Sequence, residues 1–309
     1  MVKIGKSSVE TTPMGLGTNA VGGHNLFSNL DDQEGIRIVQ KSIASGITLL
    51  DTAFVYGLGE SEKLIGQAIK GMDRSKIQIA SKGAQKLQPD GSLELDNSPE
   101  FLRQAVEDSL KRLNTDYLDI FYIHFPAGKT PLNEAVSALN DLKKAGKIRA
   151  IGVSNLSKDQ LIEANRDGLV DVDEEQYSLI HREMEQDRFD YLKQEQISFV
   201  PYFPLASGLL TGKYQEEQSF PVGDVRHDDP NFKGQQFKEI NQRVDVLRRL
   251  AAEHEVSVAE VVLAWYLKNP AISVVIPGAK KVSQVEDNAK SLNIKLNEQE
   301  LLLIDQTFK

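Results

Sequence analysis

Short apolar runs alternate with amphipathic stretches along the whole chain. Several runs are β-branched and almost continuously apolar, as parallel strands are when both faces are buried. Strands are predicted at residues 14–17, 48–50, 77–81, 118–123, 148–153, 171–177, 197–202 and 273–277. Apolar positions recur at helical spacing between them, which predicts helices at residues 32–45, 60–69, 99–113, 132–145, 158–165 and 256–267.

The order of these elements predicts the fold class. Strand–helix alternation repeated about eight times is typical of parallel βαβ units. A closed (β/α)8 TIM barrel suits this count and the length of 309 residues better than an open sheet. No linker or composition break divides the chain, so residues 1–309 are predicted to form one domain. The polar stretch 211–236 follows the seventh strand and is expected to be a long loop at the catalytic rim.

Composition narrows the function class. The chain has no cysteine, which excludes disulfides, thiolate metal sites and cysteine nucleophiles. Its net charge of −9 argues against binding to nucleic acid or to an anionic membrane surface. No apolar run is long enough to span a membrane, so we expect a soluble, cytoplasmic protein. No metal site is predicted, because His227-Asp228-Asp229 is more typical of a solvated turn, and nothing in the sequence indicates an oligomeric state.

Candidate chemistry gathers where predicted strands end, the position at which barrel enzymes hold their active sites. Asp51 and Tyr56 follow the second strand, Lys82 ends the third, and His124 follows the fourth. Taken singly, each has an ordinary structural explanation: a turn cap for Asp51, a rim aromatic for Tyr56, a solvent-facing Lys82 and a core His124. Their coincidence at successive strand ends favours one shared site.

These four residue types suit one kind of reaction. A phenol with a free pKa of about 10 is a poor proton donor near neutrality, but a neighbouring lysine cation stabilises its phenolate and lowers that pKa. A carboxylate keeps the lysine charged and in place, and a neutral histidine can orient a carbonyl oxygen. An Asp–Lys–Tyr–His group therefore suits protonation of a carbonyl oxygen while hydride arrives at the carbon.

The chain resembles the aldo-keto reductases over nearly its whole length. The resemblance rests on residues 51–57 (DTAFVYG), 110–126 (LKRLNTDYLDIFYIHFP) and 276–280 (IPGAK), which are similar to three family signatures in the correct order. It implies a barrel closed at its base by an N-terminal hairpin, residues 2–4 with 9–11. Tyr56 would be the general acid, tuned by Lys82 and Asp51, with His124 positioning the substrate. The third signature and the loop 211–236 are more similar to the bacterial general reductases and the potassium-channel β subunits than to mammalian aldose reductases.

The resemblance also implies a nicotinamide cofactor lying across the barrel mouth without a Rossmann domain. Ser154, Asn155 and Gln176 would hold the carboxamide, and Tyr202 would stack on the ring. Lys213 would meet the pyrophosphate and Lys280 the 2′-phosphate, so NADPH is predicted over NADH. The other cofactor contacts implied are Gly17, Thr18, Phe203, Leu205, Ser207, Gly208, Leu210, Gly278, Gln284, Asp287 and Asn288.

The sequence therefore predicts an NADPH-dependent reductase that converts small aldehydes or ketones to alcohols. Two alternatives stay open. One is a redox-sensing protein that holds the cofactor tightly and turns over slowly, and the other is a polyol or inositol dehydrogenase that uses the same residues in the oxidative direction.

Overall fold

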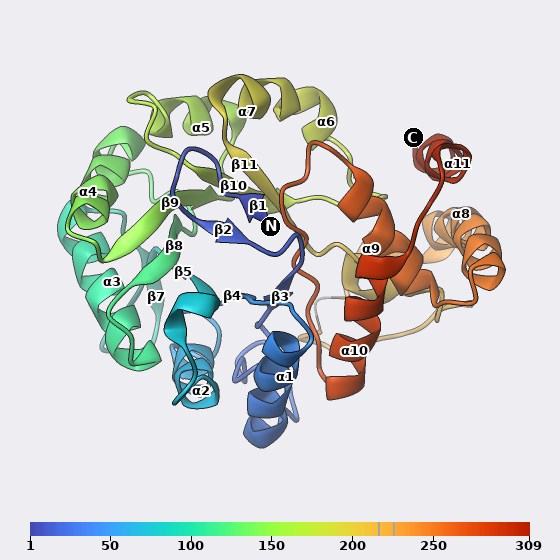
Figure 1. Ribbon diagram of the computed structural model, residues 1–309, viewed down its shortest axis with the longest axis horizontal. Helices are drawn as coiled ribbons and strands as arrows, with labels where there is room; N and C mark the ends of the chain where they lie inside the picture. The colour runs from blue at the N-terminus through green and yellow to red at the C-terminus, as the bar shows by residue number, and fades with distance from the viewer. Residues whose placement is uncertain (216, 225) are drawn as a thin grey trace.

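Seven parallel strands form the wall of a nearly closed barrel in the computed structural model, which describes residues 1–215, 217–224 and 226–309 (Figure 1). In ring order they are β3 (Gly15–Gly17), β4 (Leu49–Asp51), β5 (Gln78–Gly83), β8 (Leu118–Ile123), β9 (Ile148–Ser154), β10 (Val172–Gln176) and β11 (Ser198–Tyr202). Each pairs in parallel with the next. The predicted barrel is confirmed, and these seven strands lie within about two residues of their predicted bounds.

The eighth predicted strand, residues 273–277, closes the ring as an extended segment without a regular ladder. It makes isolated parallel bridges from Val275 to Met14 and from Gly278 to Gly17. On its other side, the Ser273 amide donates to the Phe199 carbonyl of β11 at 2.9 Å. Pro277 has no N–H group to donate, which interrupts the alternation of bonds that a ladder requires.

Helices surround the strands, and the six predicted ones are all present. They are α1 (Asp32–Ala44), α2 (Glu60–Ala68), α3 (Pro99–Leu113), α4 (Leu132–Lys144), α5 (Lys158–Ala164) and α9 (Val258–Lys268). Local sequence sets their ends. The Ser98 side chain accepts a hydrogen bond from the Phe101 amide at the start of α3, and Gly46 and Gly146 adopt left-handed φ angles of 81° and 77° just past α1 and α4.

Several elements were not predicted. They are the hairpin β6 (Gln85–Leu87) with β7 (Leu93–Leu95), the helices α6 (Met184–Asp187), α7 (Phe189–Glu195), α8 (Gly234–Glu253), α10 (Val282–Lys290) and α11 (Glu298–Phe308), and the 3₁₀ turns η1 (Arg74–Lys76), η2 (Ala206–Thr211), η3 (Pro230–Phe232) and η4 (Ser291–Asn293). In α8 the buried residues are Phe237, Ile240, Val244, Leu247, Leu250 and Ala251. They recur at intervals of three and four residues, which was a usable helical signal.

The N-terminal hairpin plugs the base of the barrel, as the resemblance implied. Strand β1 (Val2–Lys3) pairs antiparallel with β2 (Glu10–Thr11). Ile4 and Val9, beside this ladder, are buried at 0% and 3% exposure and join the barrel interior. The interior residues that pack with them come from the strands around the ring and are Leu49, Ala80, Ile120, Tyr122, Ala150, Val172, Val200, Val274 and Ile276.

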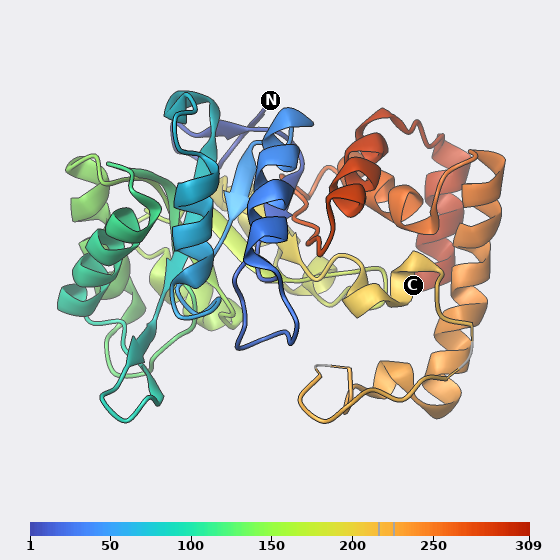
Figure 2. The same cartoon turned by 90° about the horizontal axis from the view of Figure 1, so that it is seen from below.

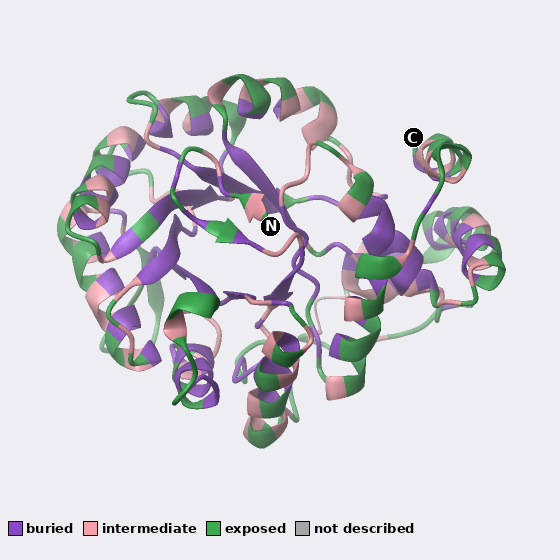
Figure 3. Ribbon diagram, viewed as in Figure 1, coloured by how far each residue is buried: buried purple, intermediate pink, exposed green. Residues whose placement is uncertain are grey.

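The opposite end of the barrel carries the loops. Figure 2 shows the N-terminal hairpin at one end of the molecule, and the β6–β7 hairpin and the long loop after η2 at the other. That loop ends where α8 begins at Gly234, slightly before the predicted residue 236. The strands between the two ends are buried. Most helices bury only their inner faces, whereas α9 is buried on nearly all sides (Figure 3). Of the helices in the described part of the chain, none is long and apolar enough to cross a membrane.

We expect the substitution Ile4→Ala to destabilise the protein by about 2–4 kcal/mol, because it would leave a cavity beneath the barrel interior. The free energy of unfolding in urea measures this loss. Met1→Ala is the matched control, since the Met1 side chain is 75% exposed in the same N-terminal segment. A loss at Ile4 no larger than the loss at Met1 would show that the hairpin does not plug the barrel.

Candidate active site

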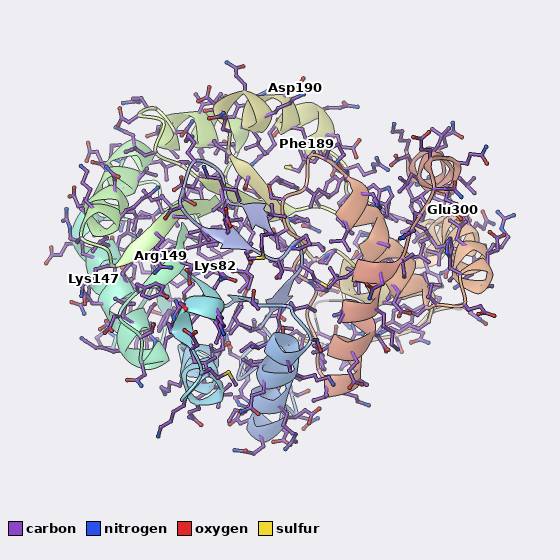
Figure 4. All side chains as sticks on the ribbon, in the orientation of Figure 1. Lys82, Lys147, Arg149, Phe189, Asp190 and Glu300 are labelled. Carbon is purple, nitrogen blue, oxygen red and sulfur yellow. The ribbon has the colours of Figure 1, made fainter. Side chains whose placement is uncertain are left out.

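Lys82 is the centre of the site. It lies on β5, where alternation turns it to the same interior side as Ala80, and Figure 4 labels it inside the ring of helices, with Lys147 at the outer edge. Its Nζ atom donates to Asp51 Oδ2 at 2.5 Å and to the Thr52 carbonyl at 3.2 Å, and lies 3.4 Å from Glu174 Oε1. Burial opposes the charge on Lys82, but Asp51 and Glu174 outweigh it and raise the lysine pKa. Lys82 is therefore a buried cation.

Tyr56 lies above this cation. It follows β4 in a tight turn, where the Gly57 amide donates to Asn25 Oδ1 at 2.7 Å. Lys82 Nζ is 5.7 Å from the centre of the Tyr56 ring, and the His124 ring meets the Tyr56 ring edge to face at 6.3 Å. The four candidate residues Asp51, Tyr56, Lys82 and His124 thus come together at one end of the barrel.

The pKa of Tyr56 is raised, whereas the sequence predicted that the neighbouring Lys82 would lower it. Burial raises this pKa above its ordinary value, and the lowering effect of Lys82 does not offset it. The negative charge of Asp51, and that of Glu174 when it is ionised, also raise the pKa of Tyr56. Tyr56 is therefore a protonated phenol at neutral pH, and Lys82 lowers the cost of the phenolate without making it the resting form.

His124 is a neutral ring. It follows β8 and is 7% exposed, and its Nδ1 atom has no hydrogen-bond partner among the described residues. Burial and then the nearby Lys82 cation hold the pKa of His124 well below its usual range. A neutral imidazole carries one N–H donor, which suits it to bind an oxygen atom that develops negative charge.

A second group of side chains lies beside His124. Asn155 adopts a left-handed φ of 59°, and its amide donates to the His124 carbonyl and to Ser154 Oγ, each at 3.0 Å. The Tyr202 hydroxyl donates to Asn155 Oδ1 at 2.8 Å. Gln176 pairs in register with Tyr202 and is exposed at the end of β10. These bonds fix three of the predicted cofactor residues, Ser154, Asn155 and Tyr202, around one amide group.

The predicted cofactor residues at the β3 end of the site are Gly17, Thr18 and Gly278. At the β3 end, a Cβ atom on Gly17 would lie 3.0 Å from the Ile276 carbonyl, so only glycine lets these strands approach. The Thr18 hydroxyl is fully buried and donates to the Asp51 carbonyl at 2.8 Å, so it holds the end of β4 in place and does not lie at an open surface. Gly278, across the bridge from Gly17, is exposed.

The segment after β11 turns sharply. Phe203, Ala206 and Ser207 have φ angles of 54°, 46° and 53°, followed by Gly208 at 96°. A Cβ atom on Gly208 would lie 2.9 Å from Lys213 Nζ, so this glycine lets the lysine fold over the turn. The predicted residues differ in exposure along this segment: Phe203 is 44% exposed, Leu205 and Ser207 are half-buried, and Leu210 is fully buried in the core.

Lys280 lies at the same rim, with its Nζ atom 3.9 Å from the centre of the Phe27 ring. Partial burial and then the positive charge of Arg226 lower the pKa of Lys280, Asp224 opposes this, and Lys213 lowers the pKa further. Three cations and the carboxylate of Asp224 therefore face the same region. The other predicted cofactor residues of this region lie on the neighbouring helix α10, where each is buried or makes a contact within the protein. Gln284 Oε1 accepts from the Lys280 and Lys281 amides, Asp287 pairs with Lys290 at 2.8 Å, and Asn288 is buried.

A metal site is absent from the described residues, among which no three His, Cys, Asp or Glu side chains lie close enough to hold an ion. The His227 ring contacts the Phe220 carbonyl through Nδ1 at 2.5 Å, and the Asp229 side chain caps η3. This segment is a structured turn of the long loop.

Comparison with known proteins decides the family. The model of the aldo/keto reductase family matches residues 13–308. The chain belongs to the aldo-keto reductase family. It is therefore an oxidoreductase of a family whose general reaction is NAD(P)-dependent reduction of carbonyl compounds. The resemblance carried by residues 51–57, 110–126 and 276–280 is confirmed.

Several relatives align with this chain over most of their length. The chain is 36% identical to aldo-keto reductase YhdN of Bacillus subtilis over 285 residues, 92% of this chain and 86% of the relative. It is 32% identical to the NADH-specific methylglyoxal reductase of Escherichia coli over 316 residues, 98% of this chain and 96% of the relative. A glycerol dehydrogenase structure from Gluconobacter oxydans has a TM-score of 0.91 at 31% identity and covers 99% of this chain and 94% of its own. An aldo-keto reductase from Klebsiella pneumoniae in complex with NADP and acetate has a TM-score of 0.75 at 29% identity, with the same coverage.

Two functional candidates in this aldo-keto reductase were missed by sequence reasoning. Glu174 lies on β10, two residues before the predicted Gln176 and on the same side of the strand, but inside the barrel beside Lys82. Two adjacent glutamates in a predicted buried strand were a usable signal, since period-2 alternation sends one inward. Arg226 lies in the long loop, where it pairs with Asp224 and contacts the Tyr214 hydroxyl at 2.9 Å. No local pattern indicates that this loop arginine faces Lys280.

We expect the His124 ring to stay neutral from pH 8 down to about pH 5.5, because protonation would place a second buried cation near Lys82. Nuclear magnetic resonance of the ring nitrogens measures this, and the same histidine in urea-unfolded protein, with a pKa of about 6.5, is the control. The depressed pKa means that only the unfolded chain takes up this proton, so His124 lowers the stability of the fold as pH falls below about 6.5. A ring that titrates in the folded protein near pH 6.5 would contradict the neutral assignment.

Proposed function

We propose that the protein is an NADPH-dependent reductase that converts aldehydes or ketones to alcohols, with Tyr56 as the general acid. The observation that supports it is the convergence of Tyr56, Lys82, Asp51 and His124 at the loop-bearing end of the barrel, with the Lys82 cation 5.7 Å from the Tyr56 ring. A buried phenol above a buried cation is suited to give up a proton only while an acceptor develops charge.

The proposed reaction transfers a hydride to the carbonyl carbon and a proton to the carbonyl oxygen. The nicotinamide, when bound, supplies a hydride to the carbonyl carbon. His124 donates an N–H bond to the carbonyl oxygen and holds it near the Tyr56 hydroxyl. Tyr56 transfers its proton to that oxygen, so that the substrate becomes an alcohol and the tyrosine a phenolate. Lys82, held by Asp51, stabilises the phenolate until a proton from solvent restores it.

The rim residues fit a dinucleotide phosphate by their chemistry. Ser154 and Asn155 carry donors and acceptors that match a carboxamide, with Gln176 beside them, and Tyr202 offers a ring that could stack on the nicotinamide. Three cations gather where phosphate groups would lie: Lys213, Arg226 and Lys280. The remaining contacts of the proposal are Gly17, Phe203, Leu205, Ser207, Gly208, Gly278, Gln284, Asp287 and Asn288. Thr18 and Leu210 are included only through their backbone, because their side chains are fully buried.

NADPH is proposed over NADH because of this cation cluster. Lys280 loses part of its hydration and is repelled by Arg226 and Lys213, and a phosphate would relieve both effects. The Klebsiella relative bound to NADP supports the choice, whereas the relative from E. coli is NADH-specific. The preference therefore needs its own test.

A second candidate is oxidation of polyols by the same residues. It is favoured by the high structural similarity to a glycerol dehydrogenase. Initial rates with a panel of aldehydes, ketones and dicarbonyls plus NADPH, set against rates with glycerol and inositol plus NADP+, separate the two. Higher kcat/KM for the carbonyl panel supports the reductase.

Tyr56→Phe should lower kcat for aldehyde reduction by about 10²–10⁴, because it removes the proton donor while keeping the ring. Cofactor affinity, followed by NADPH fluorescence, should change little. Tyr117→Phe is the matched control, since the Tyr117 ring stacks on Arg149 and Arg74, away from Lys82. Near-parental turnover of Tyr56→Phe across several aldehydes would overturn the acid assignment.

Lys280→Ala should raise the NADPH dissociation constant by about 10- to 100-fold, since a charge-assisted contact to the 2′-phosphate is lost. The NADH dissociation constant should hardly move, because NADH has no such phosphate. Lys281→Ala is the control, as Lys281 is the next residue and is also exposed. Equal dissociation constants for the two cofactors in the parent, or an unchanged ratio in Lys280→Ala, would contradict the proposed preference.

A further inference from the structure

Lys82 has two carboxyl partners where one would balance its charge. Asp51 Oδ2 lies 2.5 Å and Glu174 Oε1 lies 3.4 Å from the lysine Nζ atom. Glu174 is only 2% exposed, and its second oxygen, Oε2, is buried without a hydrogen-bond partner among the described residues. Two carboxylates and one ammonium would leave a net negative charge inside the barrel, which is costly in a poorly hydrated environment.

A proton on Glu174 removes that excess charge. Once protonated, the Glu174 carboxyl has an O–H group that can donate to the Asp51 carboxylate, and the two carboxyl groups then titrate as a unit. Burial, and then the negative charge of Asp51, raise the pKa of Glu174 to about 8, against the opposing effect of Lys82. The pKa of Asp51 is also raised, chiefly by burial. Asp51 Oδ2 lies closer to the Lys82 ammonium than Glu174 Oε1 does, at 2.5 Å against 3.4 Å, so Asp51 keeps the charge and Glu174 the proton.

The surroundings of Glu174 contain no other cation in the described residues that could take this role. The titratable groups that interact electrostatically with Glu174 come from five strands of the barrel or the turns that follow them. They are Asp51 on β4, Tyr56 after β4, Lys82 on β5, Tyr122 on β8, Glu175 on β10 and Tyr202 on β11. Tyr122 and Tyr202 both have raised pKa values, chiefly through burial, and stay neutral. Glu175 points to the other side of the strand, where Arg188 Nη1 lies 3.3 Å from its Oε1 atom.

We propose that Glu174 is a positioning residue of the reductase: it shares one proton with Asp51, keeps the buried Lys82–Asp51–Glu174 cluster neutral, and so allows Tyr56 to donate its proton. This role rests on the proposed carbonyl reduction. When Glu174 loses its proton, a second negative charge appears beneath Tyr56. That charge disfavours the phenolate which Tyr56 must become, so proton donation slows.

The pH profile of Glu174→Gln tests this role, because glutamine keeps the shape of the protonated acid but cannot ionise. In the parent, kcat/KM for aldehyde reduction should fall above an apparent pKa of about 8. In Glu174→Gln this falling limb should move up by at least one pH unit, so that kcat/KM at pH 9, relative to pH 6.5, is about tenfold higher than in the parent. If the substitution only altered the packing of the barrel, kcat/KM would change at every pH, and the pH above which it falls would stay the same.

Glu175→Gln is the matched control for that profile. Glu175 is the adjacent residue, is also buried and has a pKa raised to about 8, but it accepts from the Leu156 amide at 2.7 Å on the outer side of the strand. The Glu175→Gln profile should coincide with that of the parent. A limb that stays in place in Glu174→Gln, or that moves equally in Glu175→Gln, would overturn the proposal.

Infrared titration of the cofactor-free protein observes the proton itself and requires no turnover. In Glu175→Gln, which retains Glu174, the carbonyl band of a protonated carboxylic acid should disappear between about pH 7 and pH 9, centred near the apparent pKa of about 8. In the double variant Glu174→Gln/Glu175→Gln that loss should be absent. The same loss in the double variant would show that Glu174 does not hold the proton, whether or not the protein reduces carbonyls. If Glu174→Gln does not fold, a missing band in Glu175→Gln still overturns the proposal.

Discussion

The buried ammonium of Lys82 is the constraint on which the rest of the site depends. A charge with no exposure to water is stable only where carboxyl groups surround it, and here they come from β4 and β10 on different sides of the ring. Their positions follow from the register of the parallel strands, which sets the level of each inward side chain. Burial keeps Tyr56 a phenol although this cation lowers its pKa, and burial together with the cation keeps His124 a neutral imidazole.

The residues that stabilise the barrel and the residues of the candidate active site lie at different levels along the barrel axis. The apolar plug of Ile4 and Val9 closes one end, an aliphatic layer fills the middle, and the charged residues lie above it beneath the loops. The glycines at the mouth serve close approach rather than flexibility. Gly17 allows the ring to close against the 273–278 segment, and Gly152 leaves room for the Tyr122 ring, which would lie 2.2 Å from a Cβ atom there.

Ion networks on the outer side of the strands support the site from behind. Arg188 is buried between Asp173 and Glu175 and also donates to the Leu156 carbonyl at 2.8 Å, which anchors the turn that carries Asn155. Glu62 accepts from Ser81 at 2.6 Å and from Arg112 at 2.5 Å, and this fixes α2 and α3 to the strand that bears Lys82. Because side chains alternate along β10, Glu174 points into the barrel toward Lys82, and Glu175 points outward toward Arg188.

The sequence alone determined the order of the strands and helices and the strand ends at which Asp51, Lys82 and His124 stand, because these depend on local hydrophobic period and on short motifs. Two adjacent glutamates in a buried strand indicate that one of them points inward, but the sequence does not reveal that Glu174 reaches a cation three strands away in the ring. Arg226 was missed for a similar reason: it comes near Lys280 only through the path of a loop without periodic pattern. The raised pKa of Tyr56 was decided by tertiary burial, which outweighs the nearby lysine and exists only once the barrel has closed.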